Sequence, residues 1–77
     1  PLMKITVHEP QRQKLNFPTL YEAVRYIATS FNSTNHALTS QGVMFTDSPG
    51  DPVAFLNVKP ATPGNLRMLK LFFRGED

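Results

Sequence analysis

The sequence predicts an α+β fold in which one amphipathic helix packs on one face of a small, mostly antiparallel sheet of three to five strands. Three observations support this. Residues 19–31 repeat apolar side chains with a helical period. Several flanking segments alternate apolar and polar residues, as half-buried strands do. Turn-forming stretches rich in Pro, Gly, Asn and Asp separate these segments. The predicted order is strand, optional short strand, helix and three strands.

Length and composition limit the possible functions. We expect residues 3–75 of the 77 to form one compact domain, with 1–2 as a remnant of an expression vector and 76–77 as a frayed tail. The chain has no cysteine, which excludes disulfides and cysteine-ligated zinc. A net charge of +2 is too small by itself to indicate nucleic-acid binding. Without a signal-peptide pattern or a long apolar run, we expect a cytoplasmic protein.

The first elements are a strand and the helix. Residues 3–8 alternate as a strand, whereas 15–17 form either a second short strand or the lead into the helix. Thr19 and Glu22 form a capping-box pattern, in which the Glu22 side chain would reach back to the Thr19 amide. One side of the helix is apolar: Leu20, Ala23, Val24, Ile27, Ala28 and Phe31.

The second half is expected to contain three strands joined by turns. Residues 37–46 have strand character, with Gly42 as a bulge or a point of close backbone approach. A reverse turn at 47–51 leads into a strand at 53–59, and a second turn at 60–65 leads into a last strand at 66–74. In that last strand, one side is expected to carry Leu69, Leu71 and Phe73, and the other Met68, Lys70, Phe72 and Arg74.

No catalytic, metal or cofactor motif stands out, so we expect a protein that is not an enzyme and needs no cofactor. His8 and His36 are far apart and have no ligand partners at metal-binding spacing. Asp47 and Asp51 belong to a turn that lacks the ligand density of a calcium loop. The glycines are isolated, so no phosphate-cradling loop is predicted, and no small-molecule substrate or membrane contact is indicated.

The most informative prediction is the sheet face turned away from the helix, since it would combine aromatic and basic side chains. Its expected partner-binding residues are Lys4, Phe55, Met68, Lys70, Phe72 and Arg74. A secondary surface is the outward side of the helix, with Arg25, Tyr26 and Thr29, for which a solvated face is the default interpretation.

Three interpretations of the first surface remain open. It binds a protein partner, either a host protein or a second copy of the chain. Alternatively, it is an RNA or single-stranded DNA platform, with aromatic stacking and Lys or Arg contacts to phosphates. In the third, residues 9–17 or 37–40 fold over it and complete the core. By analogy alone, we favour a small phage- or mobile-element-encoded inhibitor that occludes a host protein surface.

Overall fold

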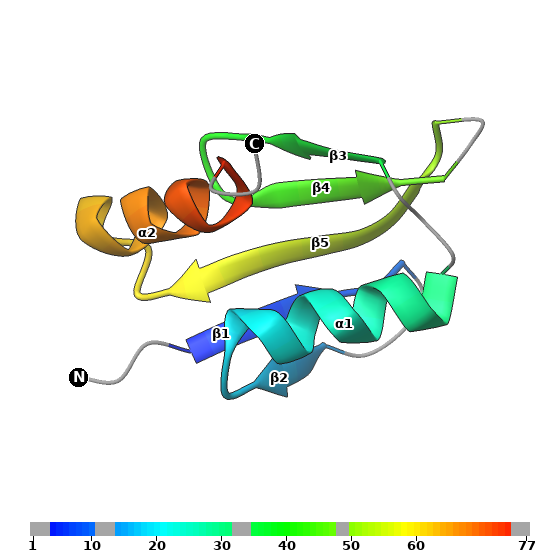
Figure 1. Cartoon of the computed structure of the whole chain (residues 1–77), viewed down its shortest axis with the longest axis horizontal. Coiled ribbons are helices and arrows are strands. Elements are labelled where there is room, and N and C mark those ends of the chain that lie inside the picture. Colours follow the sequence, from blue (N-terminus) through cyan, green and yellow to red (C-terminus); the bar gives the residue numbers. More distant parts are fainter. Residues whose placement is uncertain (1–3, 11–13, 32–34, 48–49, 75–77) are drawn as a thin grey trace.

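An antiparallel sheet of five strands carries two helices on one of its faces (Figure 1). The computed structural model describes residues 4–10, 14–31, 35–47 and 50–74. The elements are β1 (Lys4–His8), β2 (Leu15–Phe17), α1 (Leu20–Phe31), β3 (Asn35–Leu38), β4 (Val43–Thr46), β5 (Pro52–Lys59) and α2 (Pro63–Arg74). This arrangement confirms the predicted fold class, a small α+β domain with an antiparallel sheet. The presence of a second helix, however, corrects the prediction of a single one.

The strand order is β2-β1-β5-β4-β3, so the first strand of the chain pairs with the last one near the middle of the sheet. Val7 lies opposite Leu56, and Leu56 lies opposite Val43. Side chains directly opposite each other share a face of the sheet, so these three residues form one buried row across the central strands. The two edges are β2 and β3.

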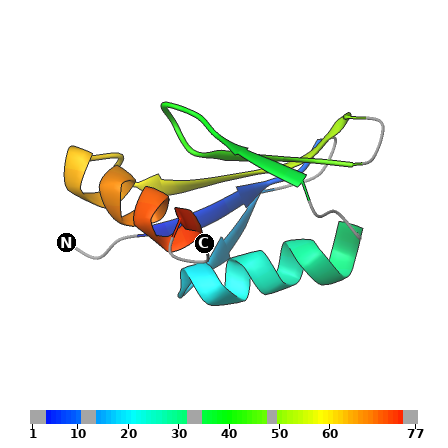
Figure 2. The ribbon, with the colours of Figure 1, turned by 45° about the horizontal axis from the view of Figure 1, so that its top comes forward.

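Both helices cover the same face of this sheet (Figure 2). The buried cluster between the layers draws on three strands, β1, β4 and β5, and on both helices: Ile5, Val7, Leu20, Ala23, Ile27, Val43, Phe45, Ala54, Leu56, Val58, Leu69 and Phe73. Alternate residues of β5, Ala54, Leu56 and Val58, face inward, as expected for a half-buried strand. Each helix has 12 residues, and neither is long and apolar enough to cross a membrane.

Helix α1 begins as predicted. The Glu22 amide donates to the Thr19 hydroxyl at 3.2 Å, so the cap closes the first turn. The reciprocal contact differs in detail, because the Thr19 hydroxyl, rather than its amide, donates to the Glu22 carboxylate. Leu20, Ala23 and Ile27 are buried, whereas Ala28 is exposed at the edge of the packed side.

The prediction of a strand at 66–74 is wrong, because this segment belongs to α2. Its start is encoded by Thr62 and Pro63: the Thr62 hydroxyl accepts from the Asn65 amide at 3.1 Å, and proline suits the first helical position. From residue 65 to residue 74 no side chain is β-branched, which favours helix over strand. Leu69 and Phe73, four residues apart, therefore reach the core together.

The expected continuous strand at 37–46 is also wrong: the chain folds there into the β3–β4 hairpin. Thr39 closes the turn, because its amide donates to the Gly42 carbonyl at 2.7 Å and its hydroxyl accepts from the Gly42 amide at 3.0 Å. A Cβ on Gly42 would collide with the backbone of Leu56. The close backbone approach predicted at Gly42 is therefore confirmed, and it occurs at the end of the turn.

Two further predictions concern short segments. The optional strand at 15–17 is present as β2 at the edge of the sheet. The turn after β4 is stabilised by Asp47, whose carboxylate accepts from the amides of Gly50 and Asp51 at 3.1 and 2.8 Å. The predicted vector remnant at 1–2 and the tail at 76–77 lie outside the described residues.

Candidate functional site

The six residues predicted to bind a partner do not share one face. Lys4 and Phe55 belong to the open face of the sheet, as their cross-strand positions show. The other four belong to α2, on the opposite side of the sheet: Met68, Lys70, Phe72 and Arg74. The prediction of one continuous aromatic and basic face is wrong, because 66–74 is a helix that packs over the core rather than a strand of the sheet.

The two aromatic residues of that set are each half-buried. Phe72 packs against the edge of the core, with its ring centroid 5.3 Å from that of Phe73. Phe55 lies beside His8 on the other side of the molecule, with a centroid distance of 6.4 Å. Both rings are less exposed than the apolar side chains Met68 and Leu71 of α2.

The outward side of α2 combines exposed apolar and basic residues. Met68 is 40% exposed and Leu71 is 59% exposed, although both are large apolar side chains. At about 100° per residue, these two and three cations occupy one continuous arc of about 160°. In order around the helix the arc holds Lys70, Arg74, Arg67, Leu71 and Met68. The helix contains no Asp or Glu, so this surface has one sign of charge.

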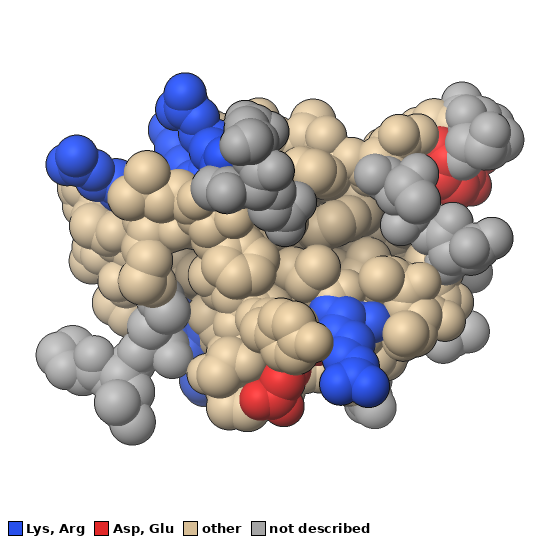
Figure 3. Space-filling view, in the orientation of Figure 1, with Lys and Arg blue, Asp and Glu red and all other residues tan. Residues whose placement is uncertain are grey.

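Figure 3 shows where this charge lies on the molecule. Blue of Lys and Arg lies along the upper edge of α2, whereas the red of Asp and Glu lies elsewhere, along α1 and at the far end of the sheet. Blue is also present over α1. Among the described residues, α2 is therefore a basic part of the surface that would attract an acidic partner.

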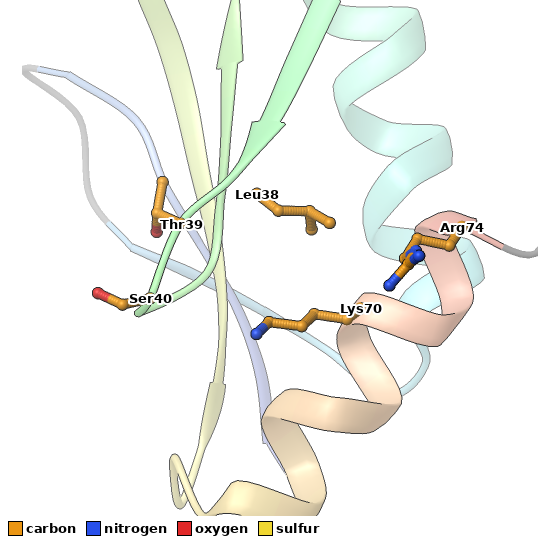
Figure 4. Close-up of a pocket in the computed structure, with 5 residues that line it drawn as sticks. All are labelled: Leu38, Thr39, Ser40, Lys70 and Arg74. Atoms are coloured by element: carbon orange, nitrogen blue, oxygen red, sulfur yellow. The ribbon is translucent and has the colours of Figure 1, made fainter.

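A groove separates the basic flank of α2 from the β3–β4 hairpin. It has a volume of about 530 Å³ and is lined by Leu38, Thr39, Ser40, Lys70 and Arg74. In Figure 4 the side chains of Lys70 and Arg74 extend from α2 into this space, and Leu38 points toward them from β3. The groove thus offers two cations next to an apolar side chain that is 39% exposed.

The wall formed by the hairpin is fixed by its own hydrogen bonds. The Thr39 hydroxyl donates to the Gly42 carbonyl at 2.9 Å and accepts from the amides of Gln41 and Gly42. The Thr39 hydroxyl is therefore used in hydrogen bonds that stabilise the turn, and we do not assign it to ligand binding. Lys70, Arg74 and Ser40 supply the other polar side chains of the groove.

Strand β3 overhangs this groove. Its helix-facing residue His36 packs its ring between those of Phe45 and Phe73, at centroid distances of 5.8 and 5.1 Å. These contacts hold β3 over α2, although all four residues of the strand are exposed. The groove therefore lies between a helix and an exposed edge strand.

The open face of the sheet is a second basic surface. Lys4 lies directly opposite Lys59, an arrangement of like charges that costs stability unless an anion compensates it. Thr6, which is only 1% exposed, donates to the Asn16 side chain at 3.3 Å on the same face. None of the described strand residues on this face is an Asp or Glu.

His8 also lies on the open face of the sheet, opposite Phe55. Burial lowers the pKa of its imidazole below the ordinary value, and the charges of Lys14 and Lys59 lower this pKa further. The Nε2 atom of His8 and the Oδ1 atom of Asn57 are buried without a hydrogen-bond partner among the described residues. The lowered pKa favours a neutral imidazole at pH 7.

The secondary surface predicted on α1 is only partly present. Arg25 and Thr29 are exposed, and the Thr29 hydroxyl donates to the Arg25 carbonyl at 3.0 Å. Tyr26 instead turns toward the sheet: its ring lies 5.3 Å from that of Phe17, and its hydroxyl donates to the Glu9 carboxylate. Its expected outward position is wrong, because this aromatic ring covers the side of the core next to β2.

Four residues of these surfaces were not predicted from the sequence: Leu38, Ser40, Arg67 and Leu71. Arg67 and Leu71 could have been predicted from the Thr-Pro helix start at residues 62–63. A helix that begins there has residues 67, 70, 71 and 74 on one side. Within the described ranges, no three His, Asp or Glu side chains gather as metal ligands. Comparisons with protein-family models, curated proteins and solved structures find no match to this chain.

Proposed function

We propose that this chain is a small, non-enzymatic protein-binding module that uses the outward side of α2 to occlude a working surface of its partner. The observation that supports this is the exposure of Met68 and Leu71, three residues apart on one helix and bordered by cations. Interface centres are rich in large apolar side chains and arginine, which is the composition of this arc. We propose that the partner is a cytoplasmic host protein and that this chain is its phage- or mobile-element-encoded inhibitor.

The spacing of these residues fits a known mode of recognition. Side chains at i and i+3 of a helix point the same way, so Met68 and Leu71 can enter one apolar groove of a partner. Methionine adapts its unbranched side chain to irregular surfaces. Because other apolar residues of α2, such as Leu69 and Phe73, are buried in the core, the helix can present this pair without leaving the sheet.

The proposal predicts that M68S/L71S abolishes capture of the partner. We expect the full chain to retain a protein from a nuclease-treated lysate of its native host, and the double variant to recover at least tenfold less of it. Losing two exposed anchors of an interface costs about 2–4 kcal/mol, which exceeds tenfold in affinity. Quantitative mass spectrometry of the captured proteins measures the ratio.

The matched control is Y21S, which replaces another exposed large apolar residue, 66% exposed, on α1. Equal recovery with M68S/L71S and with the unchanged chain would contradict the proposal. Light scattering after size-exclusion chromatography tests whether the partner is a second copy. A dimer that M68S/L71S dissociates and Y21S leaves intact would identify it as such.

A second candidate function, binding of single-stranded RNA or DNA, is favoured by the open sheet face. Lys4 and Lys59, directly opposite each other, could bind phosphates, and the half-buried Phe55 ring could stack on one base. Phe55 pairs with His8 on the same face, and the pair Thr6–Asn57 separates it from the two lysines. If the two lysines bind phosphates, K4Q/K59Q should reduce the dependence of log affinity on log salt by about 1.4, because each lost contact to single-stranded nucleic acid removes about 0.7.

Fluorescence anisotropy with a labelled oligonucleotide of mixed sequence measures that dependence. The control is K70Q/R74Q, which removes the same charge from the opposite side of the molecule and should leave the slope unchanged. Absence of oligonucleotide binding at low salt, or equal slopes for the two double variants, would rule out this face as the binding surface.

A further inference from the structure

Strand β3 is an exposed edge strand in the part of the chain that the structure describes. It pairs with β4 on one side, and no described strand pairs with its other side. All four of its residues, Asn35–Leu38, are exposed. An open edge of this kind is a template for an additional strand, and proteins commonly protect such edges with charges, proline or a covering element.

The hydrogen bonds of the β3–β4 hairpin show which amide and carbonyl groups of β3 point away from β4. The Thr39 amide bonds to the Gly42 carbonyl, so these two residues form a hydrogen-bonded pair. Hydrogen-bonded and non-hydrogen-bonded pairs alternate along an antiparallel ladder. Leu38, opposite Val43, and His36, opposite Phe45, therefore direct their amide and carbonyl groups away from β4. Their side chains point to the helix side of the sheet.

The same edge borders the groove that contains Lys70 and Arg74. A strand added beside β3 would direct alternate side chains toward the helix side, where they would meet these two cations and the exposed part of Leu38. The described residues that line this groove include no acid. The backbone edge and the charges thus select for the same occupant, an extended acidic segment.

We propose that the protein binds an acidic, extended peptide segment of its partner as a sixth strand paired to β3, with its helix-side carboxylates meeting Lys70 and Arg74. This deepens the proposed function and rests on it, because it gives the chemistry of the protein partner at the basic flank of α2. Backbone hydrogen bonds would supply affinity, and the alternating carboxylates would supply selectivity.

Charge argues against a second copy of the chain as the occupant. If two β3 edges paired about a two-fold axis perpendicular to the sheet, both pairs of helices would lie on the same side. Lys70 and Arg74 of the two copies would then face each other across the seam, which like-charge repulsion disfavours. An acidic segment removes that repulsion.

The test uses the full chain and three capped eight-residue peptides in which Thr alternates with Glu, Gln or Lys. At low ionic strength we expect the glutamate peptide to bind at least tenfold more tightly than the glutamine peptide, and the lysine peptide not to bind. Titration followed by backbone amide NMR gives the affinities. Equal binding of the glutamate and glutamine peptides would overturn the role of the two cations.

Hydrogen exchange tests the strand pairing directly. With the glutamate peptide at saturation, the amides of His36 and Leu38 should exchange at least tenfold more slowly, because their outward N–H groups become hydrogen-bonded. Amides on α1 serve as the internal reference. Binding of the peptide without added protection at His36 and Leu38 would overturn the sixth-strand model, even if the affinity depended on charge.

Substitutions separate the two contributions. R74E should weaken binding of the glutamate peptide at least tenfold and make binding of the lysine peptide detectable. K70E provides an independent second variant. R25E, the same change on the exposed side of α1, should alter the affinity less than twofold. Similar losses with R74E and R25E would reduce the effect to net charge and contradict the proposal.

A backbone variant completes the set. L38P removes one outward N–H and spares the bonds to β4, so it should abolish peptide binding, whereas L38A should retain most of it. Thermal melting verifies that both variants fold. If the peptide fails to bind while capture of a protein still depends on Met68 and Leu71, this inference is wrong and the proposed function stands.

Discussion

Replacing Leu69 with alanine is expected to lower the free energy of unfolding by about 2–5 kcal/mol, whereas L71A should change it by less than about 0.5 kcal/mol. Leu69 is 1% exposed and belongs to the core, and Leu71 is 59% exposed. The two residues differ in position by only two, which is 200° around a helix but the same face of a strand. Urea denaturation measures the difference as a shift of the midpoint at constant slope.

The comparison distinguishes helix from strand at residues 66–74. A strand with Leu69 and Leu71 on one inward face would lose similar stability with either substitution, so equal effects would contradict α2. A domain of this size has a folding stability of only several kcal/mol, and L69A could unfold a large part of the population. L69V makes a smaller deletion and should give an intermediate loss, which keeps the test quantitative.

The first helix was predictable because its local signals agree. A single apolar stripe, the Thr19 and Glu22 cap and the polar residues after Phe31 all indicate the same element. The structure adds only what depends on tertiary contacts, such as the inward position of Tyr26. That position depends on Phe17 and Glu9, which α1 meets only after the chain has folded.

The second helix was mispredicted because its pattern satisfies two periods. Leu69, Leu71 and Phe73 alternate as in a strand, while Leu66, Leu69 and Phe73 repeat as in a helix. The capping signal at Thr62 and Pro63 and the lack of β-branched residues favour the helix, as the structure shows. A short apolar-rich segment can therefore be assigned only when its ends are considered with its middle.

The candidate site was beyond prediction for a different reason. The groove depends on β3 lying over α2, and hence on the strand order β2-β1-β5-β4-β3. That order requires β1 to pair with β5, two strands separated by most of the chain, and local sequence patterns do not specify such a pairing. With 66–74 taken as a strand, the two cations of the groove were assigned to the open sheet face.

Replacing Gly42 with alanine is expected to cost about 2–4 kcal/mol of stability, at the upper end for an overpacked site. The added Cβ would lie far inside van der Waals distance of the Leu56 carbonyl oxygen, and 2.9 Å from Cζ of Phe55. Leu56 is completely buried in the central strand, so its carbonyl cannot move without displacing β5. Circular dichroism melting should show a decrease of roughly 8–30 °C in Tm.

The loss of stability expected for G42A has a steric cause rather than a conformational one. Gly64→Ala provides the matched control. Gly42 does not adopt the left-handed backbone conformation, so the loss cannot come from a φ that alanine avoids. Gly64 lies in the first turn of α2 with open space around its Cα, and alanine there should raise stability by about 0.5–1 kcal/mol. Opposite signs for the two substitutions would support both the hairpin contact with β5 and the helical start of α2. An unchanged Tm for G42A would show that the β3–β4 turn does not approach Leu56, and the position of β3 over the groove would then have to be revised.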